Sequence, residues 1–461
     1  MSKLGIVITD GVGFRNFVLS NFLTEAQLAF DEIVILSCLP ASIYQEHTQV
    51  KIIELPVFEE KFPTWFFRKA KELSHLQAHK TKNFGILDNL KANYTQEKSA
   101  RGFATRFLFK LTEAFHSESW IQFFEYAQAV SCRNNPIVQS YHSLLEIEGF
   151  DLLFFTHQRP PFIAPLAFMA KKRKLKTASF IFSWDNLASK GRMAASFDYY
   201  LVWSQLMQQE LLQFYSKVSE KAIHIVGTPQ FEPYVLERYA SSKEDFYKKM
   251  HLDPSKKTIC FSCGDISTSR NDELYITSLA ELIGKEIPDV NLLVRTSPAE
   301  DPIRFQKIVE QFPNIKWNYP KWFLSREGHQ ETWSQRVPSV EDVIDLRAIL
   351  EHSDLNINML STMSLDFMMF DKPVINIVFG TKENGFYNDQ RFIGFEHICI
   401  MLKTNATKLA KTLPELIQYI NEYLNDGAID ASNRKELIQL EVGKPLEGTS
   451  KRIAETLASL L

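Results

Sequence analysis

The sequence lacks several motifs that identify a chemistry directly. It has no D-x-D pair, which holds the metal ion in many single-domain sugar-nucleotide transferases, and no Walker A loop for phosphates. A G-x-S-x-G nucleophile turn is also absent. These absences argue against a metal-dependent sugar-nucleotide site, a P-loop nucleotide hydrolase and an α/β-hydrolase.

The sequence also contains few cysteines and carries little net charge. The five cysteines are scattered, and the C-x-x-C of Cys260 and Cys263 lies on an apolar strand with no second pair nearby. We therefore predict that these cysteines behave as buried small hydrophobic residues in a reducing cytoplasm, and we predict no metal site. The formal net charge of -3 gives no reason to expect a nucleic-acid partner.

Long apolar runs are missing as well. No stretch reaches eighteen uninterrupted apolar residues, so we predict no transmembrane helix. The apolar run in "MSKLGIVITDGVGF" is too short for the core of a signal peptide. The expected location is therefore the cytoplasm.

The length and the pattern of the chain favour two domains. With 461 residues, of which 45% are hydrophobic and 23% charged, the chain is too long for one compact core. Short apolar segments such as "KLGIVITD" and "KTASFIF" alternate with helical periodicity, and the alternation restarts at "TICFSCGD" after a charged connector. We predict an α/β fold with two parallel sheets, one Rossmann-like domain over residues 1–236 and another over 237–430.

Helical periodicity predicts the longer helices. It indicates single helices over residues 15–29, 406–424 and 434–461, and mostly helical structure over residues 62–146. Residues 62–110 contain ten Lys and Arg but three acidic residues, with aromatic side chains interleaved. This segment is either a solvated helical face above a Phe core or a surface that meets an anionic membrane or a lipid-phosphate substrate.

Polar clusters in the second half follow predicted strands. In "NMLSTMSLDFMMFDKPVI", Ser361 or Thr362 can cap a helix whose N-terminus suits a diphosphate, and the Asp366 carboxylate one turn later can bind a ribose diol. Two further strands end nearby, with polar residues that suit phosphates or a base: Ser262, Gly264 and Asp265 after one, and Arg295 at the end of the other. The plainer interpretation is a capped helix and ordinary loops. Because carboxyl ends of parallel strands meet at one edge, we predict a nucleotide site there.

Polar residues also follow strands in the first half. The candidate general bases are Asp185, His157 and Asp10, although a lone His is more often structural and Asp185 can instead accept a sugar hydroxyl. Trp184 can stack on a sugar or pack in the core. The remaining candidates for binding an acceptor and its phosphate are Gly13, Arg159, Asn186, Lys190 and Arg192.

Four segments carry a resemblance to glycosyltransferases of the GT-B type. "SWDNLASKGR", "YYLVWSQLMQQEL" and "IVGTPQFEPY" resemble bacterial proteins of surface-carbohydrate synthesis. "STMSLDFMMFDKPVI" resembles the donor-site helix of nucleotide-sugar transferases and of CDP-glycerol glycerophosphotransferases, although many members place Glu where Asp366 stands. The His-Pro pair that relatives often carry after the strand ending here in "VRTSP" is missing.

The resemblance implies a division of labour between the domains. The C-terminal domain would hold the donor nucleotide, with Ser361 and Thr362 at the diphosphate and Asp366 at the ribose. The N-terminal domain would hold the acceptor, and the C-terminal helix over residues 431–461 would cross back onto it. Residues 62–110 would suit a lipid-linked acceptor and allow peripheral contact with the inner membrane.

Together these features predict a metal-independent glycosyltransferase that moves a sugar from a nucleotide sugar to an envelope or surface-polysaccharide acceptor. It would need no cofactor, and its co-substrate would be a UDP- or CMP-linked sugar. A non-hydrolysing UDP-sugar 2-epimerase, a CDP-glycerol glycerophosphotransferase-like enzyme and a binding protein with a degenerate site are the alternatives.

Overall fold

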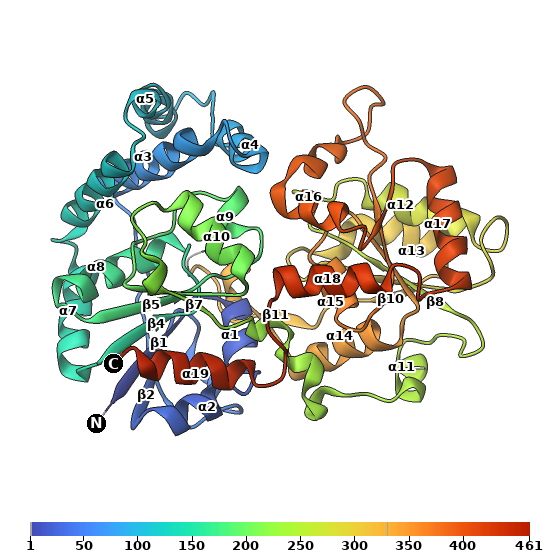
Figure 1. Ribbon diagram of the computed structural model, residues 1–461, viewed down its shortest axis with the longest axis horizontal. Coiled ribbons are helices and arrows are strands. Elements are labelled where there is room, and N and C mark those ends of the chain that lie inside the picture. Colours follow the sequence, from blue (N-terminus) through green and yellow to red (C-terminus); the bar gives the residue numbers. More distant parts are fainter. Residues whose placement is uncertain (1, 330) are drawn as a thin grey trace.

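Two parallel β-sheets divide the molecule into the two lobes seen in Figure 1. The chain is described here by a computed structural model that covers residues 2–329 and 331–461. Over these residues the first sheet has seven strands in the order β3-β2-β1-β4-β5-β6-β7, and the second has six in the order β10-β9-β8-β13-β14-β15. Every neighbouring pair in both sheets is parallel, which confirms the predicted α/β fold with two Rossmann-like domains.

The first lobe contains β1 to β7 and α1 to α10. Its strands are β1 (Lys3–Ile8), β2 (Glu32–Ser37), β3 (Lys51–Glu54), β4 (Leu152–Phe155), β5 (Lys176–Phe180), β6 (Tyr199–Val202) and β7 (Ile223–Ile225). Its helices are α1 (Gly11–Phe17), α2 (Phe22–Ala29), α3 (Phe62–His79), α4 (Phe84–Ala92), α5 (Ala100–Ala114), α6 (Glu118–Cys132), α7 (Pro136–Glu148), α8 (Ala164–Lys172), α9 (Asn186–Ser189) and α10 (Gln205–Phe214).

The second lobe contains β8 to β15 and most of the later helices. Its strands are β8 (Thr258–Ser262), β9 (Asn291–Arg295), β10 (Lys316–Asn318), β11 (Trp322–Leu324), β12 (Arg336–Pro338), β13 (Leu355–Asn358), β14 (Val374–Ile377) and β15 (Lys408–Ala410). The helices from here to the C-terminus are α11 (Lys243–Lys249), α12 (Asp272–Leu282), α13 (Gln306–Gln311), α14 (Val340–His352), α15 (Met363–Met368), α16 (Glu396–Lys403), α17 (Leu413–Asn425), α18 (Ala431–Glu441) and α19 (Thr449–Ser459).

Continuous apolar runs form the central strands because both faces of each sheet are covered. All four residues of β4, "LLFF", are buried, and so are all five of β8, "TICFS". A strand covered on one face only would alternate apolar and polar residues instead. The free cysteines Cys260 and Cys263 lie buried on and just after β8, as predicted for small hydrophobic residues.

Three of the predicted helices differ from the structure. The helix expected over residues 15–29 is interrupted, because α1 ends at Phe17 and α2 begins at Phe22. The helix expected from residue 406 is replaced at its start by β15, and α17 begins only after Thr412, whose side chain forms a capping box with Glu415. The helix expected over 434–461 is two helices, separated by Gly443 and Gly448 in left-handed conformations.

The segment between β3 and β4 is mostly helical, as predicted for residues 62–146. It consists of α3 to α7, with α3 packed between α5 and α6. The shorter α4 contacts α9, which directly follows the strand-end loop after β5. Within the described part of the chain, no helix combines the length and apolar content that crossing a bilayer requires.

Two segments tie the lobes together. The hairpin of β11 and β12 reaches from the second lobe to α1, where a Cβ on Gly11 would lie 1.7 Å from the Arg336 carbonyl oxygen, so only glycine allows this approach. At the other end of the chain, α19 packs against α2, and both termini lie on the first lobe (Figure 1). The predicted return of the C-terminal helix is therefore confirmed.

Candidate functional site

A cleft of about 450 Å³ lies where the carboxyl ends of the two sheets face each other. The first lobe contributes the loop after β5. The second contributes the ends of β8, β9 and β13 and the segment leading into α16. The lining residues used below are Ser183, Trp184, Asp185, Lys190, Ser262, Gly264, Asp265, Arg295, Ser361, Thr362, Phe395 and His397. Nine of the predicted site residues are thus brought together in one cavity.

Trp184 joins the two walls of the cleft. Its indole N–H donates a hydrogen bond to the Thr362 hydroxyl across the cleft, at 3.2 Å, and its ring meets His397 edge-on, with 4.8 Å between the centroids. The indole is buried, so it is already packed against protein on one side. Trp184 therefore connects the two lobes at the cleft.

Asp185 and Lys190 form an ion pair on the first-lobe wall, with 3.3 Å between carboxylate and ammonium. Burial raises the pKa of Asp185, but the Lys190 charge and the Ser183 hydroxyl more than offset this, so the pKa lies well below the usual range for Asp. Asp185 is thus ionised and weakly basic. Such a carboxylate is suited to accepting a hydrogen bond from a sugar hydroxyl.

Asn186 stabilises the loop after β5 through hydrogen bonds on the side away from the cleft. Its side-chain oxygen accepts from Gln158 Nε2 at 2.9 Å, and the Gln158 oxygen in turn accepts the Phe182 backbone N–H at 3.0 Å. Asn186 Nδ2 donates to the Asp185 carboxylate at 3.0 Å. These contacts fix the course of the chain after β5 and orient Asp185, so Asn186 lies behind the cleft wall that it was predicted to form.

Arg192 is engaged away from the cleft. Its buried guanidinium donates to Glu118 of α6 at 3.0 Å, and the Tyr215 ring lies 4.2 Å away. The acceptor phosphate expected at Arg192 would have to displace this ion pair, so the structure does not support that part of the prediction. Arg159 is half-buried, and neither it nor Arg192 is among the described residues that line the cleft.

Asp10 and His157 form a buried pair at the ends of β1 and β4. The Asp10 carboxylate contacts His157 Nδ1 at 2.9 Å and accepts the Gly13 N–H at 2.8 Å, so Gly13 orients Asp10 and does not face the cleft. Burial lowers the pKa of His157 despite the carboxylate, and hydrogen bonds from His157 and Thr9 lower the pKa of Asp10 despite its burial. The state is a neutral imidazole beside an ionised carboxylate.

The second ring nitrogen of His157 has no hydrogen-bond partner among the described residues. Phe182 stacks on the imidazole with 3.8 Å between centroids, and Trp333 of the second lobe lies edge-on at 6.5 Å. Neither Asp10 nor His157 lines the cleft as the described residues define it. Phe182 stands two residues before Trp184, so the pair lies behind the loop that carries the first-lobe wall.

The turn between β13 and α15 forms the opposite wall. Its two hydroxyls have different roles: Thr362 makes no capping bond and accepts from Trp184, whereas Ser361 binds a backbone N–H at the start of α15, as predicted for one of the two. Ser361 accepts the Met363 N–H at 3.3 Å, and the Ser361 N–H donates to Asn358 at 2.7 Å. The preceding Leu360 has φ +49°, a left-handed conformation that leucine rarely adopts.

Arg295 lines the cleft, but its charge is already paired. The guanidinium donates to both Asp342 oxygens, at 3.1 and 3.0 Å, and to Asn318. An anion bound here would share the guanidinium with Asp342. The predicted contact of Arg295 with a diphosphate is therefore weaker than a free cation would provide.

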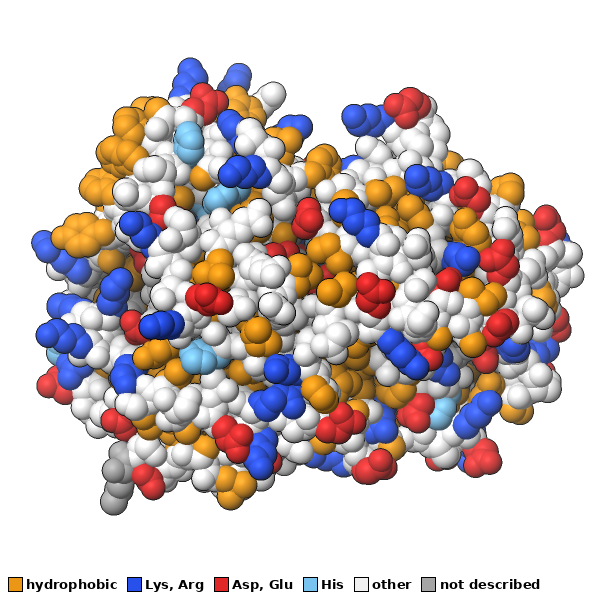
Figure 2. Space-filling view, viewed as in Figure 1, with side chains coloured by type: hydrophobic (Ala, Val, Ile, Leu, Met, Phe, Trp, Pro, Cys, Tyr) orange, Lys and Arg blue, Asp and Glu red, His pale blue; other side chains and the backbone are white. Residues whose placement is uncertain are grey.

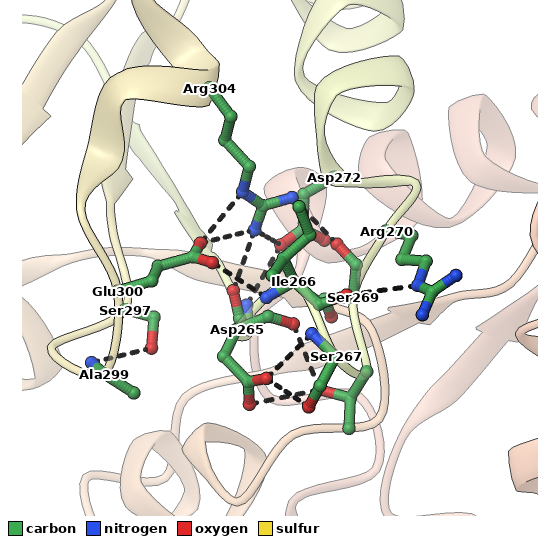
Figure 3. Close-up of polar contacts among 12 residues, drawn as sticks. Asp265, Ile266, Ser267, Ser269, Arg270, Asp272, Ser297, Ala299, Glu300 and Arg304 are labelled. Atoms are coloured by element: carbon green, nitrogen blue, oxygen red, sulfur yellow. Dashed lines mark hydrogen bonds and ion pairs between the residues drawn. The ribbon is translucent and has the colours of Figure 1, made fainter. Parts of the chain in front are cut away.

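The turn after β8 is held by a largely buried network of hydrogen bonds and ion pairs, shown in Figure 3. Arg304 donates to the carbonyl oxygens of Gly264 and Ser269, at 2.9 and 3.0 Å, and lies 3.4 Å from Asp272. The N–H of Gly264 donates to Asp272 at 3.0 Å. The backbone N–H groups of residues 266–269 likewise find acceptors within the protein.

A phosphate that approached this turn would therefore compete with acceptors that already pair most of its backbone N–H groups. Ser262 at the end of β8 is also engaged, since it accepts from Asn356 at 2.8 Å. Asp265 uses its carboxylate to accept the Ser267 N–H at 2.9 Å. The turn therefore presents a fixed, acidic rim to the cleft.

Asp366 lies in a second, smaller cavity of about 180 Å³ that shares Arg295, Ser361 and Thr362 with the cleft. The Tyr234 hydroxyl of the first lobe donates to its carboxylate. Burial raises the pKa of Asp366 to about 6. The predicted ribose contact would place the sugar in this side cavity, next to Tyr234.

Sequence reasoning missed the wall that follows β14. Phe395, just before α16, and His397, in the first turn of α16, reach the cleft, and burial lowers the pKa of His397 to about 4, so its imidazole is neutral. The expectation that ligand-binding residues follow the carboxyl ends of parallel strands applies to "VINIVFG" as well. The segment between that strand end and His397 is about twenty residues long, and no motif marks where it turns back.

Comparison with known proteins shows likeness in fold alone. No family model and no curated protein matches the sequence. The solved structure of UDP-GlcNAc 2-epimerase from Neisseria meningitidis bound to UDP-GlcNAc is similar with a TM-score of 0.52 at 10% identity, over 100% of both chains. The UDP co-structure of MnaA from S. aureus gives 0.50 at 11% identity, over 98% of this chain and 95% of the other.

A glycosyltransferase from Rickettsia africae gives 0.53 at 12% identity, over 100% of this chain and 98% of that one. Each of these similarities spans both lobes of the chain. The protein therefore has the GT-B fold, with two Rossmann-like domains and a C-terminal helix returned to the first.

Proposed function

We propose that the protein is a metal-independent glycosyltransferase that moves a sugar from a nucleotide sugar to an envelope or surface-polysaccharide acceptor. The observation that carries the proposal is the cleft where the ends of both parallel sheets face each other, with Trp184, Asp185 and Lys190 opposite Ser361 and Thr362. A polar cleft with an aromatic wall suits a sugar ring between a nucleotide and an acceptor. The acceptor is a glycan or a lipid-linked glycan, at the cytoplasmic face of the membrane.

The donor is a UDP- or CMP-linked sugar bound by the second lobe. Ser361 supplies a hydroxyl for the diphosphate, and Asp366 contacts the ribose in the side cavity beside Tyr234. Lys190 is the cation that faces the cleft from the first lobe, and its charge stabilises the leaving diphosphate. The resemblance of "STMSLDFMMFDKPVI" to donor-site helices and the ligands in the solved structures above support this direction of binding.

Two groups share the work on the acceptor. Asp185 is ionised and weakly basic, so we assign it to holding an acceptor hydroxyl. His157 lies behind the loop after β5, but it is neutral and oriented by Asp10 and its second nitrogen has no partner among the described residues, so we assign proton removal to it once an acceptor displaces that loop.

The test is nucleotide release from UDP-, GDP- and CMP-sugars in the presence of an envelope lipid extract. We expect release with one nucleotide class, only when the extract is present, and unchanged by EDTA. Ser361→Ala should weaken donor binding, whereas Ser140→Ala on the exposed face of α7 should leave it unchanged. Release that needs added Mg²⁺ or Mn²⁺ would contradict the metal-independent mechanism, and no release with any donor would overturn the proposal.

A UDP-sugar 2-epimerase is the second candidate, and the buried Asp10–His157 pair favours it. Epimerisation removes and returns a proton on the sugar itself, so it needs an acid–base pair but no acceptor. Interconversion of UDP-GlcNAc and UDP-ManNAc without the lipid extract would identify this activity. Transfer that depends on the extract, without such interconversion, would exclude it.

A further inference from the structure

Large aromatic side chains are exposed over α3, α5 and α6. Their exposed fractions run from 39% to 69%, although such side chains are normally buried. Figure 2 shows hydrophobic side chains gathered at the upper left over these helices, with Lys and Arg side chains around them. We call the following residues the aromatic patch: Phe62, Phe103, Phe107, Trp120, Phe123 and Tyr126.

The spacing of these rings along the helices places them on the solvent-facing sides. Phe103 and Phe107 stand one turn apart on α5, while Leu108 and Thr112 on its other side are buried. Phe107 stacks against Phe66 of α3 with 6.4 Å between centroids, so the two helices share one aromatic surface. The core of this segment is filled without the patch, because the buried residues of α5 and α6 already pack on α3.

Cations border the patch. The Arg106 guanidinium lies 4.6 Å from the Phe103 ring, and the Arg101 guanidinium lies 5.5 Å from the Trp65 ring. Lys98 and Lys110 are exposed close by in the chain. Aromatic rings with flanking Lys and Arg are the composition that binds the interface of an anionic bilayer.

We propose that the aromatic patch docks the protein on an anionic lipid bilayer. A second copy of the chain fits less well, because a twofold contact sets the same surface against itself and would bring the Arg and Lys border of one copy against that of the other. A bilayer accepts the rings among its acyl chains and offers phosphates to the cations. The proposal extends the basic segment expected from the sequence to α6, and it does not depend on which reaction the cleft performs.

The patch is linked to the cleft through α4. Asn89 Nδ2 of α4 donates to the Ser189 carbonyl at 3.0 Å, next to Lys190 of the cleft wall. On the other side, Phe84 of α4 packs against Phe395 with 5.8 Å between centroids. A docked protein would therefore contact the bilayer through the same lobe that carries this cleft wall, with α3 and α4 between the patch and that wall.

The experiment is co-sedimentation of the full chain with vesicles of phosphatidylcholine alone or mixed with phosphatidylglycerol. We expect binding to the anionic vesicles that weakens with salt, and at least about tenfold weaker partitioning for F103S/F107S and for F123S/Y126S. A K98Q/R101Q/K110Q variant should lose the preference for phosphatidylglycerol. The matched control is Phe323→Ser, an exposed aromatic of the second lobe, which should bind like the unmodified chain.

Thermal unfolding of each variant checks that the fold is kept, which we expect because the substituted side chains are exposed. Unmodified binding by both double serine variants would overturn the proposal, as would equal binding to both vesicle types. Self-association that disappears in F103S/F107S, measured by sedimentation equilibrium without lipid, would assign the patch to a second copy instead. Nucleotide release is measured separately, so failure of the transferase proposal leaves this test intact.

Discussion

Neighbouring residues in the loop after β5 have separate roles. Trp184 reaches across the cleft to Thr362, Asp185 pairs with Lys190 at the cleft wall, and Asn186 turns inward to Gln158. The mixture of an aromatic ring, a carboxylate and an amide at one strand end is explained by these different directions. For Asp185, a single substitution can distinguish binding of the acceptor from proton removal.

Asp185→Asn keeps the size of the side chain and removes its charge. Because Lys190 holds the pKa of Asp185 low, the carboxylate is a poor base, and we expect the acceptor KM to rise about tenfold while kcat changes little. Steady-state kinetics with varied acceptor measures both. A fall in kcat of a hundredfold or more at unchanged KM would instead make Asp185 the base.

The pH dependence of kcat tests the role given to His157. A general base must be neutral, and burial lowers the pKa of His157 below its ordinary value of 6.5. We therefore expect kcat to stay constant as the pH falls to 6.5 and to decline only at lower pH, with His157→Gln removing most of the activity at every pH. An unchanged profile in His157→Gln would remove His157 from the mechanism.

Asp366 makes stability depend on pH. Burial raises its folded pKa to about 6, above the ordinary 3.8, so ionisation destabilises the fold as the pH rises from about 4 to about 6. Asp366→Asn should flatten that part of the profile and raise the free energy of unfolding at pH 7 by up to about 3 kcal/mol. Urea unfolding across this pH range measures it. Asp289→Asn, at an exposed position paired with Lys256, should leave the slope unchanged.

At the scale of elements, a ladder of buried amides supports the turn into α15. Asn358 Nδ2 donates to Asn356 and to Ser364, at 2.6 and 3.1 Å, and its oxygen accepts from Asn376 Nδ2 at 3.0 Å and from the Ser361 N–H at 2.7 Å. Four partners thus meet at one side chain. This explains how the left-handed Leu360 and the short helix after it are held in place.

Removing the centre of the ladder should be costly. Asn358→Ala leaves several buried polar groups without partners, so we expect the free energy of unfolding to fall by about 2–4 kcal/mol and donor binding to weaken. Asn421→Ala on the exposed side of α17 is the matched control and should change stability by less than about 0.5 kcal/mol. Equal effects of the two substitutions would show that the ladder does not hold the turn.

At the scale of the whole molecule, the chain crosses between the lobes and returns. Glu232 of the first lobe accepts the backbone N–H groups of Asn21 and Ser450, at 3.1 and 2.9 Å, and so joins α2 to the start of α19. Leu457 of α19 is fully buried. The last helix therefore belongs to the core of the first lobe, although it follows the second in sequence.

Leu457→Ala should reveal this dependence. A buried Leu truncated to Ala costs about 2–5 kcal/mol, so we expect a lower urea midpoint for the transition of the first lobe. Fluorescence of the first-lobe tryptophans and circular dichroism follow it. Leu440→Ala on the exposed side of α18 should leave the midpoint unchanged. If Leu457→Ala behaved like this control, α19 would not stabilise the first lobe in solution.

The sequence by itself determined the alternation of strands and helices, and hence two parallel sheets. Buried strands such as "LLFF" need apolar residues on both faces, and that requirement is local and visible in the chain. It also located the polar strand ends, since parallel strands share one direction. The sequence did not predict the helix breaks at residues 18–21 and 442–448, because the helical periodicity continues through both segments.

Only the tertiary structure decided which of the polar residues face the cleft. Arg192, Arg295 and Asp366 look equally available in the sequence, but Glu118, Asp342 and Tyr234 engage them, from positions 74, 47 and 132 residues away. His397 reaches the site from the first turn of α16, after a long segment with no motif. The partners of a charged group come from distant segments of the chain, so their pairing depends on packing in three dimensions. The positions where strands end therefore predict where a site lies. They do not predict which charged side chains at the site remain unpaired.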